Sequence, residues 1–524
     1  MRATLLFLLG IAACPVATGM PVLPFEQDSQ QTRSLTPPLS AALDNLVSVK
    51  QKAAGIPRAR ACSDEVFLRR VFLDVIGTLP TREEVVEFLA DKSAGKRQAQ
   101  IDRLLERPEF ADYWGMKWGD ILRVKSEFPV NLWPNAAQAY DGWIRACIRQ
   151  NMPYSQFAHQ LLTAEGSNFR DPPVNFLRSA GSREPEALAA AAALTFMGER
   201  LSNWTPEKRA DLAVFFSRVG FKMTGEWKEE IVYFTPPQGD NPVSARLPDG
   251  TPIKIKPETD PREVFAQWLL SSANSPFAKN AANRIWFWIF GRGIIHEPDD
   301  SRPDNPPSNP ELLAWLARQL QAAKYDTKQL LRIILNSDTY QLSPIPPDDK
   351  VRGAGELTSY PVRRIEAEVL MDAINRITGA KEEYMSMIPE PFTYLPDDTR
   401  SMALPDGSIT SSYLELFGRP PRDTGLLAER PANVTASQRL SLLNSKHMLS
   451  KINNSRKLKD LLQSAPTEEE AVSRLYLTFL SRYPTPDEME VAAAYKTPAN
   501  TGKNQKMFDI AWALMNSPEF LYRH

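Results

Sequence analysis

Two distant stretches of the sequence share one design, and this repeat constrains the fold more than any other feature. One reads RRVFLDVIGTLPTREEV from Arg69, and the other reads SRLYLTFLSRYPTPDEM from Ser473. In each, apolar residues at three- and four-residue spacing predict an amphipathic helix, and a Pro-Thr pair then opens a second helix. Each is followed by a run that ends in Pro-Glu-Phe, LLERPEF or LMNSPEF. The repeat therefore predicts a chain built from helix pairs.

The second helix of each pair begins with the T-x-x-E spacing of a capping box. In this box the threonine hydroxyl accepts a hydrogen bond from an early helix N–H, and the glutamate reaches back to the N-cap. The two strong examples are Thr81 with Glu84 and Thr485 with Glu488, and a weaker third is Ser308 with Glu311. Because helix stability is sufficient reason for such caps, we interpret the repeat as architecture and not as a catalytic motif.

The length of 524 residues is too great for one core and predicts more than one domain. We expect a mainly α protein of two related multi-helix halves. The first helical domain is predicted over 39–228 and the second over 258–524, where it ends in a repeat of the opening unit. Between them, 229–257 has alternating apolar residues and the turn dipeptide Asp249-Gly250, which predicts a β-hairpin connection.

The N-terminus has the pattern of an export signal. Arg2 precedes the short apolar run LLFLLGIAA, and we assign 1–20 to a signal peptide or a lipoprotein signal. IAAC, ending at Cys14, is similar to a bacterial lipobox, in which the cysteine is lipidated; cleavage after the small residues of PVATG is the alternative. Residues 21–38 are rich in Pro, Gln and Ser and predict a tether. We expect an exported protein, periplasmic or at the outer surface, with a lipid anchor as one alternative and no transmembrane segment.

The other two cysteines have two interpretations. In an oxidising compartment Cys62 and Cys147 could form a disulfide between the start of the first domain and a later helix. The alternative is a pair of buried free thiols.

Several classes of function receive no support from the sequence. The 62 basic and 63 acidic residues nearly balance, so charge gives no reason to expect a nucleic-acid partner. No G-x-S-x-G, H-E-x-x-H, Walker, Rossmann or C-x-x-C motif occurs, and the four histidines are far apart. We therefore predict no cofactor and no zinc site built from histidine or cysteine.

A polar, proline-stiffened loop between an aromatic segment and a capped helix is the candidate site, because restrained polar groups suit binding or catalysis. The loop runs from Arg292 to Asn305 within FGRGIIHEPDDSRPDNPPSNPELL. The candidate catalytic residues are His296, Asp299 and Asp300, and the candidate ligand-binding residues are Arg292, Arg302 and Asn305.

Three interpretations of this loop stay open. In the first, the adjacent aspartates form salt bridges with Arg292 and Arg302 and fix the loop to its domain. In the second, Glu297 and the aspartates supply oxygen ligands to Ca²⁺, although their spacing differs from that of an EF-hand. In the third, His296 and an aspartate form an acid–base pair in a pocket. The neighbouring run WFWIF, from Trp286, could stack on sugars, but five successive apolar residues are more typical of a buried helix.

Long stretches of the chain resemble a known pair of domains. FLRRVFLDVIGTLPTREEVVEFLAD, RPEFADYWGMKWGDIL and NMPYSQFAHQLLTAEGSNFRDPPVNFLR resemble the first of two paired domains of unknown function in exported planctomycete-type proteins. NRIWFWIFGRGIIHEPDDSRPDNPPSNPELLAWLA and YDTKQLLRIILNSDTYQLS resemble the second. The resemblance implies no activity, but such proteins are often fused to cytochrome-c-like domains and carbohydrate-binding modules. Many relatives have a C-x-x-C-H-type motif where this chain reads LTFMGERLSNW, so we expect no haem here.

These observations favour an exported binding or scaffold protein, with a polysaccharide or a surface protein as its partner. The alternative is a hydrolase-like enzyme that uses the loop from Arg292 to Asn305, with His296 or an aspartate as the acid–base group.

Overall fold

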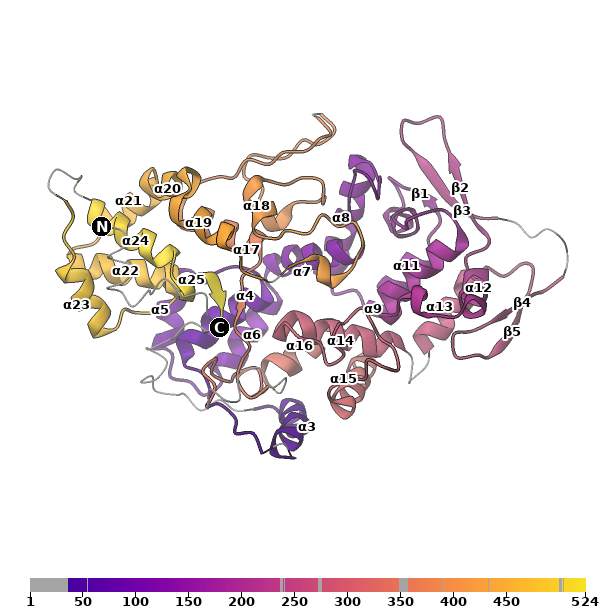
Figure 1. Cartoon of the computed structure of the whole chain (residues 1–524), viewed down its shortest axis with the longest axis horizontal. Helices are drawn as coiled ribbons and strands as arrows, with labels where there is room; N and C mark the ends of the chain where they lie inside the picture. Colours follow the sequence, from indigo (N-terminus) through magenta and orange to yellow (C-terminus); the bar gives the residue numbers. More distant parts are fainter. Residues whose placement is uncertain are drawn as a thin grey trace.

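The structure of the chain, a computed structural model, describes residues 36–53, 55–235, 239, 241–271, 276–347, 357–389, 391–431, 433–498, 502 and 504–524. The predicted signal, Cys14 and nearly all of the predicted tether lie outside these residues. The described chain is mainly helical, as predicted. It is elongated, with the C-terminal helices at one end and the small sheets around residues 219–255 at the other (Figure 1).

Helices form most of the N-terminal part. Proline opens many of them, because its fixed φ suits the first helical position and no N–H is needed there. These helices are α3 (Pro38–Ala53), α4 (Asp64–Val75), α5 (Arg82–Ala90), α6 (Lys96–Leu105), α7 (Pro108–Ile121), α8 (Pro134–Arg149), α9 (Tyr154–Thr163), α10 (Asn175–Arg178), α11 (Pro185–Met197) and α12 (Pro206–Val214), with the short 3₁₀ turns η1 (Pro172–Val174) and η2 (Leu201–Asn203). Of these helices, α4 and α7 are buried on nearly all sides.

Short antiparallel strands follow the N-terminal helices, except for one strand that lies within that part of the chain. They are β1 (Gly166–Ser167), β2 (Val219–Met223), β3 (Glu230–Phe234), β4 (Val243–Arg246) and β5 (Pro252–Ile255). The predicted hairpin is confirmed, since β4 pairs with β5 and Asp249-Gly250 lies between them. The prediction missed β2, which pairs with β3 in a sheet of order β1-β3-β2. The five residues VGFKM are too few and too mixed to show a clear alternation.

Helices also form the C-terminal part. They are α13 (Pro261–Ser271), α14 (Pro276–Phe290), α15 (Pro310–Ala322), α16 (Thr327–Leu335), α17 (Ala367–Thr378), α18 (Ser412–Leu416), α19 (Ala436–Asn444), α20 (Lys446–Asn453), α21 (Arg456–Gln463), α22 (Glu468–Leu480), α23 (Pro486–Ala494), α24 (Gln505–Met515) and α25 (Pro518–Leu521), with the turns η4 (Ser401–Ala403) and η5 (Leu427–Glu429). Strand β6 (Arg363–Arg364) pairs with β7 (Tyr522–Arg523), which fastens the C-terminal segment to the middle of the molecule.

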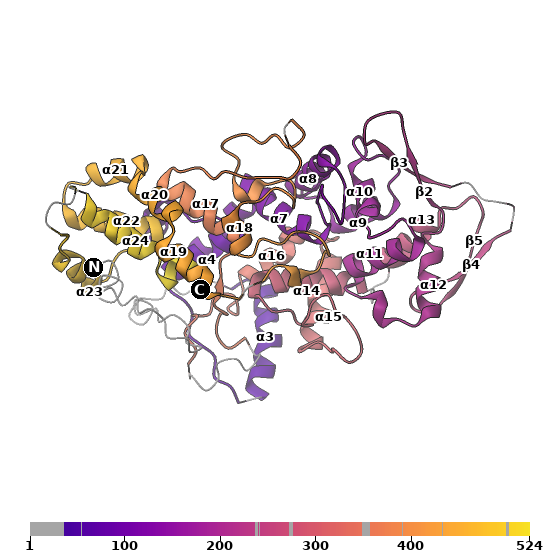
Figure 2. The same ribbon diagram turned by 45° about the horizontal axis from the view of Figure 1, so that its top comes forward.

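The two repeated units lie side by side, although they are far apart in the sequence. In Figures 1 and 2 the helices α22 and α25 return to lie beside α5 and α4. The buried Arg69 of α4 donates hydrogen bonds to the carbonyl oxygens of Phe479 and Phe520, each at 2.9 Å. The buried apolar side chains of both helical parts form one continuous cluster. The two parts therefore share a core.

Both strong capping boxes are present, with both reciprocal hydrogen bonds. In each unit an arginine joins the box glutamate to the glutamate of Pro-Glu-Phe. Arg107 does so in the first unit, at 2.6 Å from the box glutamate, and Arg482 does so in the second, at 2.7 Å from each. The same guanidinium groups lie over the central aromatic rings of the preceding helices, Phe72 at 5.6 Å and Tyr476 at 5.3 Å. The repeated phrase thus builds one ion-paired helix unit twice.

Two expectations from the sequence differ from the structure. The third capping box is wrong, because α15 begins at Pro310 and the side chain of Asn309, not Ser308, accepts from the N–H of Leu312 at 3.1 Å. The disulfide is not formed either, since Cys62 and Cys147 are buried and are not bonded to each other. Cys62 lies beside Arg97, with its Sγ atom 3.9 Å from Nη1, and Cys147 lies among aromatic side chains, so the two thiols have separate surroundings.

Candidate functional site

Asp299 of the candidate loop is buried and connects three segments of the chain. Its carboxylate accepts hydrogen bonds from Arg284 of α14 at 2.9 Å and from the backbone N–H of Leu427 at 2.6 Å. Arg200 donates to the carbonyl oxygen of Asp299 at 3.1 Å. The sequence suggested an ion pair between Asp299 and an arginine within the loop. The ion pair is made instead with Arg284 of α14, a helix that the sequence marked chiefly by its apolar run WFWIF. Asp299 fixes the loop to the rest of the fold.

The other polar residues of the loop form a half-exposed cluster. Arg302 lies 3.2 Å from the carboxylate of Asp300, which is one of the pairs expected from the sequence. The side-chain amide of Asn305 donates to the carbonyl oxygen of Asp300 at 2.9 Å, and that of Asn203 donates to its carboxylate at 3.0 Å. These bonds hold the loop together and attach it to η2.

The structure does not bring the histidine of the loop to an aspartate. His296 lies at the surface, with its Nε2 atom 3.5 Å from the carboxylate of the adjacent Glu297. Arg292 is also exposed and has no ion-pair partner among the described residues. The three candidate catalytic residues therefore point to no common pocket.

An open hollow with about 1490 Å³ of empty space lies beside this loop. Its lining comes from the end of α11, the turn η2, the β4–β5 turn, α13, α14 and the loop itself. We call it the indole–carboxylate hollow, after the residues that distinguish it, and its lining includes Glu199, Trp204, Asp249, Trp268, Asn280 and Arg302.

Each of the two tryptophans in this hollow is tied to a carboxylate. The indole N–H of Trp204 donates to Glu199 at 2.9 Å, and that of Trp268 donates to Asp249 at 2.8 Å. Both rings are half-buried. The hydrogen bonds fix the rings in place and leave each carboxylate with further lone pairs for other donors.

The two carboxylates differ in their electrostatics. Burial raises the pKa of Glu199, against the opposing effects of its hydrogen bond from Trp204 and the charge of Lys208. The pKa of Asp249 is lowered, chiefly by the hydrogen bond from the backbone N–H of Thr251 and also by the indole N–H. One hollow thus holds a carboxyl group that retains its proton more readily than usual and another that releases it more readily.

Asn280 places a further polar group in the wall of the hollow. Its side chain is buried and donates to the carbonyl oxygen of Thr195 at 3.0 Å, while its Oδ1 atom accepts no hydrogen bond from the described residues. Gly198 makes this position available: at φ +69° it ends α11 in the left-handed conformation, and a Cβ atom there would lie 2.6 Å from Oδ1. The wall therefore contains an acceptor to which none of the described residues donates.

A second, more enclosed pocket with about 840 Å³ of empty space lies between α7, the end of α14, β6 and the loop that precedes α19. We call it the cationic pocket. The charged residues that line it are Lys117, Asp120, Arg363, Arg364, Glu366 and Arg430. Its wall also contains Leu427, whose N–H binds Asp299. The two pockets are therefore attached to the same buried aspartate.

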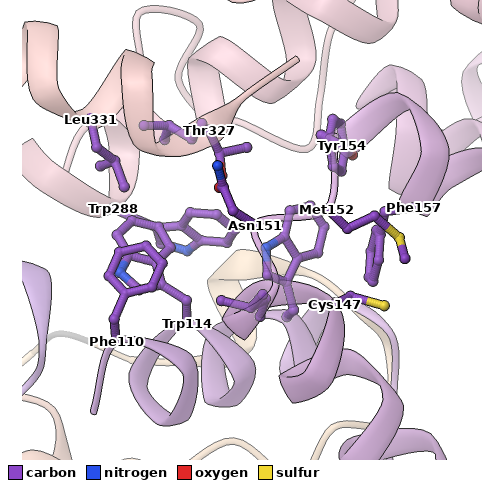
Figure 3. Close-up of a pocket in the computed structure, with 13 residues that line it drawn as sticks. Phe110, Trp114, Cys147, Asn151, Met152, Tyr154, Phe157, Trp288, Thr327 and Leu331 are labelled. Atoms are coloured by element: carbon purple, nitrogen blue, oxygen red, sulfur yellow. The ribbon is translucent and has the colours of Figure 1, made fainter. Parts of the chain in front are cut away.

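A third pocket, with about 540 Å³ of empty space, is apolar and lies among α7, α8, α9, α14 and α16 (Figure 3). Trp288 packs edge-on against Trp114 and Trp118, with ring centroids 5.5 Å apart in each case, and no charged side chain lines the space. Burial raises the pKa of Cys147 to about 12, so its thiol stays protonated and is a poor nucleophile at neutral pH. The aromatic run of α14 is thus part of the core, as the sequence indicated.

Aromatic side chains also meet on the surface. Trp133 lies 6.2 Å from Trp227 and 5.5 Å from Phe392, measured between ring centroids, and Lys228 lies over both indoles. Trp227 is 69% exposed. No pocket described above includes these rings, so they serve as a comparison for the tryptophans of the hollow.

Sequence reasoning found the loop beside the hollow but missed the residues that characterise it. Glu199 and Trp204 are only five residues apart, within the segment LTFMGERLSNW. Asp249 had been noted only as part of a turn, and Trp268 lies within an ordinary helical pattern. Proximity in sequence could have suggested the first pair, whereas no local signal indicates that the two pairs meet.

The described residues contain no group of three or more His, Cys, Asp or Glu side chains that could hold a metal ion. None of the helices in the described part of the chain is long and apolar enough to cross a membrane.

Comparisons with known proteins identify two domains. Residues 42–199 match PSCyt2, a protein of unknown function (DUF1549), and residues 261–496 match PSD1, a protein of unknown function (DUF1553). No curated protein and no solved structure matches the chain. Trp204 and Asp249 of the hollow lie between the two matched ranges, whereas the cationic pocket is built from residues within them. The chain belongs to the planctomycete-type proteins that pair the PSCyt2 and PSD1 domains of unknown function.

Proposed function

We propose that the protein is a binding protein for neutral oligosaccharides, which it holds in the indole–carboxylate hollow. The observation that carries the proposal is the pair of tryptophans, each fixed by a carboxylate in one open hollow. Flat aromatic rings can cover the C–H face of a sugar ring, while carboxylate and amide oxygens accept hydrogen bonds from its hydroxyl groups. Both kinds of group line this hollow.

The charges around the hollow support a neutral ligand. Its lining has four cationic side chains, Arg200, Lys208, Lys279 and Arg302. Against them stand Glu199 and Asp249 in the lining, and Asp300 and Asp304, which lie 3.2 and 3.4 Å from Arg302. Because four cations meet four carboxylates, the hollow has no net charge to attract an acidic polymer.

The openness of the hollow and the predicted export support the same role. An open hollow can admit one segment of a longer polymer, and export to the periplasm or outer surface would bring the protein to such polymers. A surface protein is the alternative partner for this binding role. It would bind at the exposed cluster of Trp133, Trp227 and Phe392.

Calorimetric titration of the purified protein with neutral hexasaccharides of glucose, xylose, mannose and N-acetylglucosamine tests the proposal. We expect at least one to bind, and Trp268→Ala to weaken that binding at least about tenfold, because an aromatic anchor is lost. Trp227→Ala is the matched control, since it removes an exposed tryptophan outside the hollow. Failure of every hexasaccharide to bind, or a loss in Trp227→Ala and not in Trp268→Ala, would contradict the assignment.

A second candidate function is hydrolysis of a glycosidic bond in the same hollow. It is favoured by the opposite pKa shifts of Glu199 and Asp249, which suit an acid that protonates the leaving oxygen and a base that takes a proton from water. The water would add across the broken bond, with its hydroxyl group on the anomeric carbon. Here these two residues take the roles that the sequence offered to His296 and the aspartates of the loop.

Release of reducing ends from a bound hexasaccharide distinguishes the enzyme from the binding protein. If the hollow hydrolyses its ligand, Glu199→Gln and Asp249→Asn lose the release and still bind. If the protein only binds, wild type releases no reducing ends.

A further inference from the structure

The cationic pocket lies at the meeting point of two chains of buried ion pairs. In the first chain, Asp74 lies 2.9 Å from Arg363 and 3.1 Å from Arg523, and Glu366 pairs with Arg523 and lies 3.1 Å from Lys117. Two carboxylates thus face three cations. Burial alone would raise the pKa of Glu366, but the surrounding cations hold it well below its ordinary value.

The second chain has the same composition. Asp120 lies 2.9 Å from Arg422 and 2.7 Å from Arg430, and Glu368 lies 2.6 Å from Arg430 and 3.5 Å from Arg419. Again two carboxylates face three cations. Burial lowers the pKa of Arg419 to about 10. This direction is expected when nearby carboxylates compensate only part of the cost of burying the positive charge.

Arg364 adds a cation that has no carboxylate partner among the described residues. Its guanidinium donates instead to the carbonyl oxygens of Ile365 at 3.3 Å and Pro431 at 2.9 Å, and lies 6.0 Å from the ring centre of Phe417. Burial lowers its pKa. Gly418, at φ +81°, leaves room for it, since a Cβ atom there would lie 3.2 Å from Nη2. The fold thus brings to the wall of the pocket an arginine that forms no ion pair with a described carboxylate, although the charges of Glu366 and Glu368 oppose the effect of burial on its pKa.

Seven cations therefore face four carboxylates around one pocket, a surplus of three positive charges. Among the next charges outward, Lys125 pairs with Asp423 at 2.6 Å and Arg123 stands near Glu429. The buried Asp406, whose backbone carbonyl accepts from Arg419 at 2.9 Å, adds one carboxylate and lowers the surplus to two positive charges. A surplus of buried charge is unfavourable unless something of the opposite sign compensates it. An anion in the pocket would provide that compensation.

We propose that the cationic pocket binds a small organic oxyanion, a carboxylate or a sulfate with an apolar body. Arg363 and Arg364 each have a buried Nε–H group with no acceptor among the described residues, which could donate to such an oxyanion. The guanidinium group of Arg430 adds positive charge, but it is already bonded to Asp120 and Glu368. The same pocket is also lined by Phe287, Trp288 and other apolar residues, which suit the body of the ligand. The proposal is independent of saccharide binding, because the two sites share no lining residue.

Thermal melting of the purified protein tests the proposal with benzoate, phenyl sulfate, inorganic sulfate and chloride, all at equal ionic strength. We expect benzoate or phenyl sulfate to raise the wild-type midpoint by at least about 2 °C over chloride. The better of the two identifies the head group, and a rise with inorganic sulfate alone would contradict the apolar body. No rise beyond chloride with any of the anions overturns the proposal.

Arg364→Gln supplies the matched comparison. It removes a cation that no described carboxylate pairs with, so we expect it to lose most of the rise and to melt no lower than wild type in chloride. Arg364→Lys keeps the charge without the forked donors and should retain part of the rise. Arg103→Gln, an exposed arginine of α6, should behave as wild type. An equal rise in wild type and Arg364→Gln would place the anion elsewhere and overturn the assignment.

Discussion

The indole–carboxylate hollow and the cationic pocket are both attached to Asp299, but they differ in net charge. In the hollow, the four cations of the lining are balanced by its two carboxylates together with Asp300 and Asp304 beside Arg302, and the polar groups surround half-buried indoles. In the cationic pocket, a surplus of cations is buried around an apolar wall. Balanced polar groups beside flat rings suit a neutral polyol, whereas buried surplus charge suits a ligand of opposite charge. Net charge and burial, more than size, therefore separate the two ligand classes.

Removing the carboxylate of Asp299, to which both pockets are attached, should have the largest effect on stability. In Asp299→Ala, Arg284 loses its buried partner and the N–H of Leu427 loses its acceptor. Removing one member of a buried ion pair typically costs about 3–5 kcal/mol, so we expect a loss of that size in the free energy of unfolding, measured with urea.

The neighbouring Asp300→Ala is the control, because its partner Arg302 is partly exposed and such pairs contribute at most about 1 kcal/mol. Equal losses in the two variants would show that Asp299 is not the attachment.

Two glycines allow the pockets to be disturbed separately. Gly198 and Gly418 both have positive φ, and a Cβ atom at either would crowd a wall residue, Asn280 in the hollow and Pro431 beside Arg364 in the cationic pocket. Alanine at either position should cost about 1–2 kcal/mol of stability. We expect Gly198→Ala to weaken only saccharide binding and Gly418→Ala to weaken only anion binding, as measured by titration. Loss of both ligands in either variant would mean that the pockets are not separate.

The helical framework could be predicted from the sequence because its signals are local. Thr81 and Glu84 are three residues apart, and their capping box forms as expected. The charge network could not be predicted, because Asp74 meets Arg523 and Asp120 meets Arg430 only after the chain has folded back on itself. The same holds for the hollow, where no pattern joins its two indole–carboxylate pairs.

The salt dependence of ligand binding should also distinguish the two pockets, with a smaller effect. Ions screen charge–charge attraction, so anion binding in the cationic pocket should weaken several-fold between about 0.05 and 0.5 M NaCl. Saccharide binding in the balanced hollow should change less than about twofold. Titrations at both concentrations measure this, and a similar salt dependence at both sites would remove the distinction.

The smallest expected effect is that of pH on Glu199. Its pKa is raised in the folded protein, so its contribution to stability is complete below its ordinary pKa of about 4.5 and is lost as the pH rises through the raised value. Glu199→Gln removes this dependence and should gain in melting temperature relative to wild type as the pH rises from about 4 to 7. A difference that is constant with pH would show that burial does not act on this carboxyl group.

The most direct test is a calorimetric titration of the best-binding neutral hexasaccharide, with and without saturating benzoate or phenyl sulfate. Wild type and the double variant Trp204→Ala/Trp268→Ala are compared. We predict that wild type binds the saccharide with the same affinity in both conditions and that the double variant does not bind it. Equal binding by the double variant, or displacement of the saccharide by the anion, would contradict the assignment of a neutral saccharide to the indole–carboxylate hollow.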